Sequence, residues 1–192
     1  MSDVARTSIP DSSDVVGVVL AAGAGTRYGM PKILAHEGAW LDSAVTALRD
    51  GGCDRVVVAM GAAKVVPPAG AEVLLVEEWE AGIGATVSAV LRWARRQRHA
   101  AGLVLQVVDT PDVGAGAVAR VVDAAGARRD ALVRAVFDGR PGHPVYLGAD
   151  HFGPALDVIG GDVGAQVYLR GRAVSLVECG DLASGEDIDV RE

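Results

Sequence analysis

Residues 20–32 read LAAGAGTRYGMPK, a glycine-rich stretch that holds one arginine and one lysine. It overlaps the end of an apolar, β-branched run at Val15–Ala21, which predicts a strand buried on both faces, as in a parallel sheet. A glycine-rich loop after such a strand exposes backbone N–H groups that can form a concave anion site. Arg27 can bind phosphate through two parallel hydrogen bonds, and Lys32 can act as a point charge. The stretch therefore predicts a polyphosphate site at one edge of a sheet.

The glycines of this loop do not fit two familiar phosphate motifs. Gly23, Gly25 and Gly29 are expected to adopt positive φ and to leave no Cβ in the way of a ligand. A P-loop requires GxxxxGK[ST], whereas Lys32 comes three residues after Gly29 and no hydroxyl follows it. A dinucleotide fingerprint requires GxGxxG, but position 28 is Tyr. The alternative that stays open is a glycine-rich turn with two solvated cations.

Outward from this loop, apolar runs alternate with amphipathic segments at intervals of roughly 25–30 residues, the spacing of βαβ units. We predict further strands over 55–60, 72–76, 103–108 and 131–136, and helices over 41–49, 85–98 and 115–127. From residue 139 onward the pattern predicts a short strand, one or two short helices and a last strand. The sequence thus predicts one α/β domain over 14–192 with a doubly wound, mostly parallel sheet, after a disordered lead at 1–13.

Composition and charge argue against several classes of partner. The 192 residues carry a net charge of −7, which argues against a nucleic-acid binder because such proteins need a basic face. No apolar run reaches the ~18–20 residues of a membrane span, and the polar start lacks the apolar region of a signal peptide. Cys53 and Cys179 form no disulfide framework and are expected to be buried free thiols in a reducing cytosol. We therefore expect a cytoplasmic protein without nucleic-acid or membrane partners.

The loop resembles a known family signature. LAAGAGTRYGMPK is similar to LAAGxSxRxGxxK of the nucleotidyltransferases that activate phosphorylated small molecules with an NTP, and most similar to the MobA/MocA-like branch, which includes molybdenum cofactor cytidylyltransferase. Thr26 stands one position after the usual serine place, which here is Gly25. The resemblance implies a nucleotide-diphospho-sugar transferase-like, Rossmann-like fold. The residues that match in place are Leu20, Ala21, Ala22, Gly23, Arg27, Gly29 and Lys32.

Two carboxylates are candidate ligands of Mg²⁺, which prefers oxygen and keeps several waters. Asp109 follows the predicted strand 103–108, beside the glycine loop in such a sheet. The resemblance places a metal aspartate there in a GDQP-like context, where this chain reads VVDTPD, and a second in a DIDTP-like segment, where Asp189 of 187–190 (DIDV) matches. The alternatives are that Asp109 caps the following helix or turn, and that Asp189 belongs to a solvated acidic tail.

The resemblance implies further contacts. Gly82 and Thr86 open the long predicted helix and, with Gly61, are placed against the nucleotide. On the acceptor side, His143 lies in GHP and Asp162 in GDVGA. The alternatives are an ordinary helix start, a structural histidine and a capping aspartate, and the arginines of 85–98 are expected to form a solvated face. The nucleotide-binding set is Leu20, Ala21, Ala22, Gly23, Gly25, Thr26, Gly61, Gly82 and Thr86.

The reaction implied is attack by a phosphate monoester on the α-phosphorus of an NTP, with release of pyrophosphate. Arg27, Lys32 and Asp109 are the implied catalytic residues. The opening AAG favours CTP as donor, and the implied acceptor is molybdopterin, with passage of the product to a molybdoenzyme or its chaperone. The alternatives are a GTP-dependent enzyme, a sugar- or alditol-phosphate nucleotidyltransferase, and a non-catalytic nucleotide-binding protein.

Overall fold

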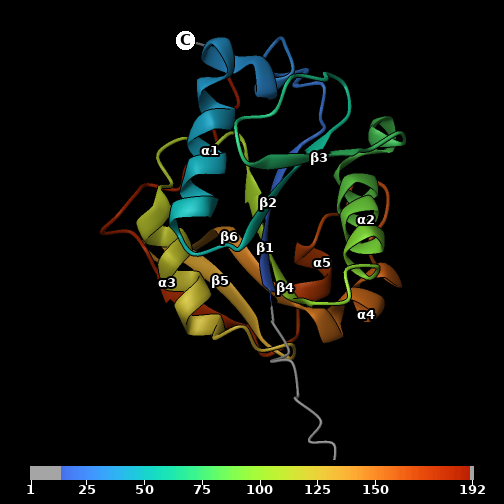
Figure 1. Ribbon diagram of the computed structural model, residues 1–192. Helices are drawn as coiled ribbons and strands as arrows, with labels where there is room; N and C mark the ends of the chain where they lie inside the picture. The colour runs from blue at the N-terminus through green and yellow to red at the C-terminus, as the bar shows by residue number, and fades with distance from the viewer. Residues whose placement is uncertain (1–13, 191–192) are drawn as a thin grey trace, which may run out of the picture.

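The computed structural model of the chain describes residues 14–190, so the expected disordered lead at 1–13 lies outside the described residues. It contains a seven-stranded sheet in the order β3-β2-β1-β4-β6-β5-β7 (Figure 1). Neighbouring strands are parallel except on either side of β6, which runs antiparallel to β4 and to β5. The strands are β1 Asp14–Ala21, β2 Arg55–Met60, β3 Ala71–Leu75, β4 Ala100–Val107, β5 Leu132–Phe137, β6 Arg140–Gly148 and β7 Ser175–Glu178.

Helices cover both faces of this sheet (Figure 1). One apolar layer joins the sheet to α1 and α3, and a second joins the opposite face to α2, α4 and α5. The mostly parallel, doubly wound α/β architecture expected from the sequence is confirmed. The helices are α1 Ala39–Asp50, α2 Ile83–Ala94, α3 Ala115–Ala125, α4 Phe152–Leu156 and α5 Gln166–Leu169, with 3₁₀ turns at Lys32–Gly38, Trp79–Ala81 and Ala149–His151.

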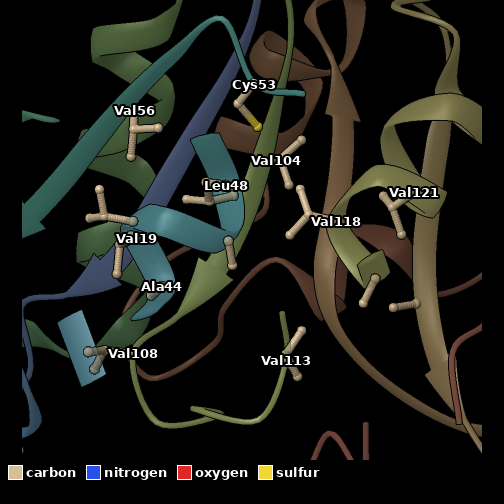
Figure 2. Close-up of a cluster of buried hydrophobic side chains, with 14 of the residues drawn as sticks. Val19, Ala44, Leu48, Cys53, Val56, Val104, Val108, Val113, Val118 and Val121 are labelled. Carbon is tan, nitrogen blue, oxygen red and sulfur yellow. The ribbon is translucent and has the colours of Figure 1, made fainter. Parts of the chain in front are cut away.

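The core beneath α1 and α3 consists mainly of aliphatic side chains. Figure 2 shows Val19 and Val104 of the sheet packed beside Leu48 of α1 and Val118 of α3, all fully buried. Burial of each such side chain contributes about 1.5–3 kcal/mol. The end of α1 comes so close to α3 that a Cβ at Gly51 would lie 2.5 Å from Val118. The glycine stop predicted after this helix is therefore also required for packing.

The predicted elements are present, with shifted bounds. The helix predicted over 85–98 spans 83–94, because it begins at Gly82 with a φ of +100° and ends where the N–H groups of Arg96 and Gln97 bond to carbonyls three residues back. Its arginines are exposed, as expected. The strand predicted over 103–108 spans 100–107. The sequence reading missed the 3₁₀ turn at Lys32–Gly38.

The sequence pattern also did not predict the direction of β6, and this direction shapes the site. Because β6 is antiparallel to β4, with Leu105 opposite Val145, its first residues lie at the edge where β1 and β4 end. The parallel pair β5 and β7 ends at the same edge. This edge therefore gathers the loop at 22–31, the turn after β4, the start of β6 and the segment after β7. Within residues 14–190, no helix is long and apolar enough to cross a membrane.

Candidate active site

The glycine loop leaves β1 and turns back on itself. The N–H of Gly29 donates to the carbonyl of Gly25 at 2.9 Å, and both glycines have positive φ, +88° and +61°. A Cβ at Gly25 would collide with the carbonyl of Met30. The expectation of positive φ at Gly23 is wrong, because the turn is made by the two later glycines. Gly23 instead borders open space, since a Cβ there would meet nothing within 4 Å.

The fold brings the four predicted charged residues together at the carboxyl edge. Nζ of Lys32 lies 2.7 Å from Oδ2 of Asp109 and 2.8 Å from Oδ1 of Asp189. Nη1 of Arg27 lies 3.7 Å from Oδ2 of Asp189, and its side chain is 83% exposed. Asp109 therefore bonds to the lysine and does not cap the next helix, whose N-cap is Gly114.

The charged groups of this cluster shift one another's pKa values. Burial alone would lower the pKa of Lys32, but hydrogen bonds to Asp109 and Asp189 outweigh burial and raise it. The bond from Lys32 in turn holds the pKa of Asp189 below its usual range. Burial raises the pKa of the neighbouring Asp187, and the charges of Asp109 and Asp189 raise it further. Three carboxylates and the two cations Lys32 and Arg27 thus make up the cluster, which leaves it with excess negative charge.

The segment that carries Asp189 is anchored and is not a free acidic tail. The carboxylate of Asp112 accepts hydrogen bonds from the backbone N–H and the hydroxyl of Ser184, each at 2.7 Å. The N–H of Ile188 donates to the carbonyl of Asp109 at 3.0 Å. The contacts of Ser184 and Ile188 therefore fix the position of the chain from which Asp189 reaches Lys32.

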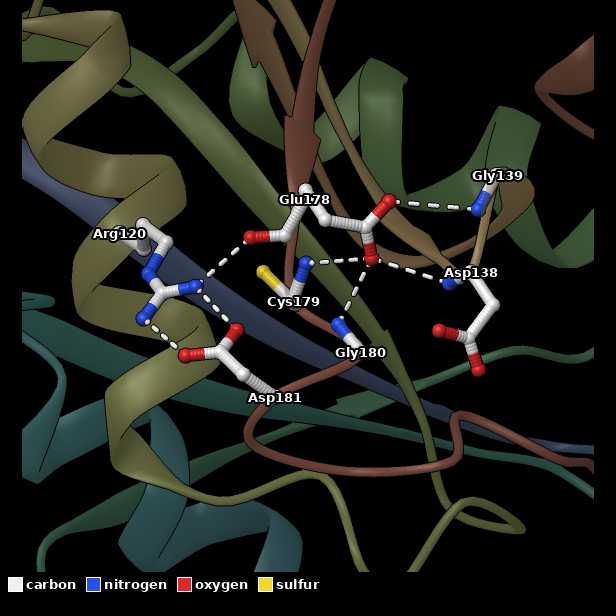
Figure 3. Close-up of polar contacts among 7 residues, drawn as sticks. All are labelled: Arg120, Asp138, Gly139, Glu178, Cys179, Gly180 and Asp181. Atoms are coloured by element: carbon white, nitrogen blue, oxygen red, sulfur yellow. Dashed lines mark hydrogen bonds and ion pairs between the residues drawn. The ribbon is translucent and has the colours of Figure 1, made fainter.

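A second set of contacts anchors the start of this segment (Figure 3). The carboxylate of Glu178 accepts backbone N–H bonds from Gly180 at 2.8 Å and Asp138 at 2.9 Å. These bonds, led by that from Gly180, lower the pKa of Glu178. Arg120 binds both oxygens of Asp181 at 2.6 and 2.9 Å and the carbonyl of Glu178 at 2.7 Å. The chain thus leaves β7 in a defined direction, toward the charged cluster.

Two adjoining cavities lie beside the cluster. The first, of about 220 Å³, is lined by Gly23 and Gly25 of the loop together with Lys32 and Asp109. The second, of about 190 Å³, is lined by His143 and Asp162, among others. The two cavities share the lining residues Leu20, Ile83 and Val107. The predicted phosphate-side and acceptor-side residues therefore border neighbouring cavities, which together are called the hollow below.

The acceptor-side residues differ in detail from expectation. His143 is half-buried, and burial, assisted by the charge of Arg134, lowers its pKa to about 4 against a smaller opposing effect of Asp109. It is therefore neutral at pH 7 and offers a single N–H donor without a charge. Asp162 is exposed and does not cap α5, whose N-cap is Ala165. Its segment instead packs on α2, where the N–H of Gly84 donates to the carbonyl of Gly161 at 2.8 Å.

Some predicted nucleotide contacts do not border these cavities. Thr86 is 3% exposed and faces the core, while α2 presents Ile83 and Val87 to the hollow. Gly61 is buried, and a Cβ there would lie 2.6 Å from Trp79. Ala22 is buried and its carbonyl accepts the N–H of Ala62 at 2.9 Å, whereas Thr26 is exposed. Gly82 lines neither cavity, whereas Leu20, Ala21, Gly23 and Gly25 line at least one. Nucleotide contact by all nine residues remains a prediction.

Sequence reasoning missed two residues at the site. Ile83 borders both cavities, and Arg134 borders the second. Arg134 had a visible signal, because it is the only charged residue of the otherwise apolar strand LVRAVF. Ile83 had none, because an apolar residue at the start of a helix is equally consistent with packing.

The donor set suits a hard divalent cation. Two carboxylate oxygens already converge on one cationic nitrogen, and oxygen is the ligand that Mg²⁺ and Mn²⁺ prefer. Within residues 14–190, no group of three or more His, Cys, Asp or Glu side chains is arranged to hold a metal ion. A cation held by Asp109 and Asp189 would therefore complete its coordination with phosphate oxygens and water.

Comparison with known proteins identifies the family. The pattern of the MobA-like NTP transferase domain matches residues 17–177, which is most of the chain. The chain belongs to this family. The match covers the glycine loop, Lys32 and Asp109 but ends before Asp189. The MobA-like assignment drawn from LAAGAGTRYGMPK is confirmed.

Relatives agree in length and fold. The chain is 32% identical over 193 residues to a Nicotine blue oxidoreductase of Paenarthrobacter nicotinovorans, with 93% of each chain covered. Its structure is similar to that of a homologue, from Mycobacterium sp. strain JC1, of Mycobacterium tuberculosis Rv0371c, with 28% identity, a TM-score of 0.74 and coverage of 92% and 90%. It is also similar to Rv0371c solved in complex with manganese, with 26% identity, a TM-score of 0.68 and coverage of 87% and 89%. The expected nucleotide-diphospho-sugar transferase fold is confirmed.

Proposed function

We propose that this MobA-like protein is a nucleotidyltransferase that moves a nucleoside monophosphate from an NTP to a phosphorylated small molecule. The observation that carries the proposal is the convergence of Lys32, Asp109 and Asp189 beside a glycine loop that lines a cavity of about 220 Å³. A glycine loop beside the ammonium group of Lys32 suits a polyphosphate. Membership of the MobA-like NTP transferase domain family supports the same reaction class.

In the proposed reaction, an oxygen of the acceptor's phosphate forms a bond to the α-phosphorus of the NTP. The bond from that phosphorus to the oxygen that bridges to the β-phosphorus breaks, and pyrophosphate leaves with the bonding electrons. Lys32, Arg27 and the loop N–H groups hold the leaving pyrophosphate in line. For this role Lys32 turns from the carboxylates toward the phosphates, a short movement because its ammonium group already borders the cavity.

Asp109 and Asp189 are the residues that would hold a divalent cation, proposed to be Mg²⁺. When bound, the cation would neutralise charge on the phosphates. Support comes from the pair of converging carboxylates, and from the related Rv0371c structure, which was solved with manganese. The two carboxylates would position such a cation beside the loop.

We propose CTP as the donor and molybdopterin as the acceptor, with passage of the product to a molybdoenzyme or its chaperone. The support is the likeness of the AAG opening at 21–23 to the cytidylyl branch. Use of GTP, or of a sugar or alditol phosphate as acceptor, would change the specificity but not the reaction.

The test is Mg²⁺-dependent release of pyrophosphate, measured for each of the four NTPs with molybdopterin and with sugar and alditol phosphates. We expect release with CTP, and a loss of at least about 10²-fold in kcat for Asp109→Asn, since removal of one electrostatic contact to the reacting phosphates costs about that much. Asp123→Asn, an exposed carboxylate on α3, is the matched control. If Asp109→Asn and the control turn over equally fast, the proposed cation site is wrong.

A second candidate function is oxidoreduction, because a relative of 32% identity is named Nicotine blue oxidoreductase. As a test of this candidate, nicotine blue is mixed with NADH or NADPH, which can donate a hydride while solvent supplies the proton. Loss of the colour of nicotine blue with NADH or NADPH, without pyrophosphate release in any NTP mixture, would favour this candidate. Pyrophosphate release without dye reduction would favour nucleotidyl transfer.

A further inference from the structure

A third cavity extends the hollow of the active site along the sheet. It has a volume of about 360 Å³ and lies over β5, the start of β6 and β7. Arg134, Gln166 and Leu169 line both this cavity and the second one. The three cavities therefore adjoin one another in a row, from the phosphate loop after β1 to the edge strand β7, and this row is called the groove below.

The far end of this groove is cationic in an acidic protein. Arg134, Arg170 and Arg172 all line the third cavity, although the chain has a net charge of −7. None of the three has a carboxylate partner within residues 14–190, whereas eight other Arg and Lys residues of the described chain do. Three arginines that no carboxylate of the described chain neutralises are suited to bind an anion.

Two of these guanidinium groups are held in place without using all their donors. Nε of Arg134 donates to the carbonyl of Gly142 at 3.0 Å. Nη1 of Arg172 donates to the carbonyl of Tyr168 at 3.0 Å, and its guanidinium carbon lies 3.8 Å from the centre of the Tyr168 ring. A guanidinium carries five N–H donors, so most of them remain available to a ligand. Arg170 is exposed, and its side chain makes no hydrogen bond in the described part of the chain.

The middle of the groove is mainly aliphatic. The aliphatic lining residues of the second cavity, between the phosphate loop and the arginines, are Leu20, Ile83, Val87, Leu105, Val107, Val145 and Leu169. Its polar lining residues are fewer: Arg134, His143, Asp162 and Gln166. An apolar body would gain from burial there.

We propose that the acceptor has two anionic groups joined by an apolar body, which favours an acceptor other than molybdopterin, whose pterin ring carries many hydrogen-bonding groups. The reacting phosphate lies beside Lys32, the body fills the second cavity, and the remote anion binds Arg134, Arg170 and Arg172. The placing of the reacting phosphate rests on the proposed function, but the apolar body and the remote anion rest on the groove alone.

The test uses two fluorescent probes with the same aromatic scaffold. Anilinonaphthalene sulfonate carries an anion, and N-phenylnaphthylamine is its neutral counterpart. We expect saturable binding of the sulfonate, weakened about fivefold or more by Arg170→Glu, which corresponds to about 1 kcal/mol. The neutral probe should bind Arg170→Glu as it binds the unmodified protein. Arg95→Glu, another exposed arginine without a carboxylate partner in the described chain, is the matched control and should change neither probe.

The variant Ile83→Ser tests whether the probes bind in the groove, because Ile83 borders the first two cavities. The side chain of Ile83 is 44% exposed, so its replacement should not unfold the protein. This variant should weaken the binding of both probes. The proposal is overturned if the unmodified protein shows no saturable sulfonate binding, if Arg170→Glu and Arg95→Glu behave alike, or if Ile83→Ser changes neither probe. CTP binding with Mn²⁺ is measured on the same variants. Its absence, with the probe results as expected, would reject the proposed nucleotidyl transfer and leave the anion groove standing.

Discussion

Replacement of Lys32 by methionine should strengthen the binding of a divalent cation in the absence of nucleotide. The ammonium of Lys32 lies 2.7 Å from Asp109 and 2.8 Å from Asp189, the two carboxylates proposed to hold the cation. A cation that enters must displace both hydrogen bonds. In the Lys32→Met variant the carboxylates would be free, and a side chain of similar length would keep the packing.

The size of the expected change in Kd follows from how exposed the two carboxylates are. A hydrogen bond to a charged group contributes about 1.5–3 kcal/mol, and the bond to Asp109, whose side chain is 21% exposed, falls in this range at about 2 kcal/mol. The Asp189 side chain is 52% exposed, so screening reduces that bond to about 1 kcal/mol. Together they correspond to about a hundredfold change in Kd.

The assay is titration with Mn²⁺, in which electron paramagnetic resonance reports the free ion. We expect Lys32→Met to bind Mn²⁺ about a hundredfold more tightly than the unmodified protein, and to bind CTP more weakly because the phosphates lose a cation. Lys64→Met, a substitution of an exposed lysine without a carboxylate partner within residues 14–190, is the control. Equal Mn²⁺ affinity in the two variants would show that Lys32 and the cation do not share a site.

Three further predictions concern the fold. Gly51→Val should lower the free energy of unfolding in urea by about 1–3 kcal/mol, because its side chain would press on Val118. Because backbone N–H bonds hold the pKa of Glu178 below its unfolded value of about 4.3, the ionised group stabilises the fold above that value, and this stabilisation is lost as pH falls through the folded pKa. The difference in urea midpoint between the unmodified protein and Glu178→Gln should therefore be largest above pH about 5 and shrink toward pH about 3. Burial raises the pKa of the Cys53 thiol to about 12, so a thiol reagent should modify Cys53 only after unfolding.

Each of these has a contrary outcome, and Gly51→Val also has a control. Gly153→Ala adds a methyl group where nothing lies within 4 Å, so it should not destabilise, and Gly51→Val should differ clearly from it. A constant difference in urea midpoint for Glu178→Gln between pH 3 and 5 would contradict the assigned role of its charge. Rapid labelling of Cys53 in the native protein would show that the α1 layer opens without global unfolding.

The sequence predicts most of the sheet because its strands carry local signals. Continuous apolar runs mark β1, β2 and β4, and glycines mark the ends of several helices. The 3₁₀ turn from Lys32 has no apolar period of its own, and the direction of β6 depends on which strand it pairs with. Neither property can be read from the local pattern, so both were found only in the structure.

The site, too, has residues that local sequence predicts and residues that only the fold brings together. Gly25, Gly29, Lys32 and Asp109 follow from a motif or from the end of a strand, both of which are local. The arginine end of the groove joins residues of β5 to residues 170 and 172 after α5, which are distant in the chain. The anchoring of Asp189 through Asp112 and Asp109 is equally non-local. A single sequence shows these residues but not that they meet.

The order of parts along the chain separates the sheet from one charged group of the site. The last strand of the sheet, β7, ends at Glu178, whereas Asp189 comes eleven residues later. Proteolytic cleavage between these two residues would therefore leave all seven strands in one fragment and remove the second carboxylate proposed to bind the divalent cation.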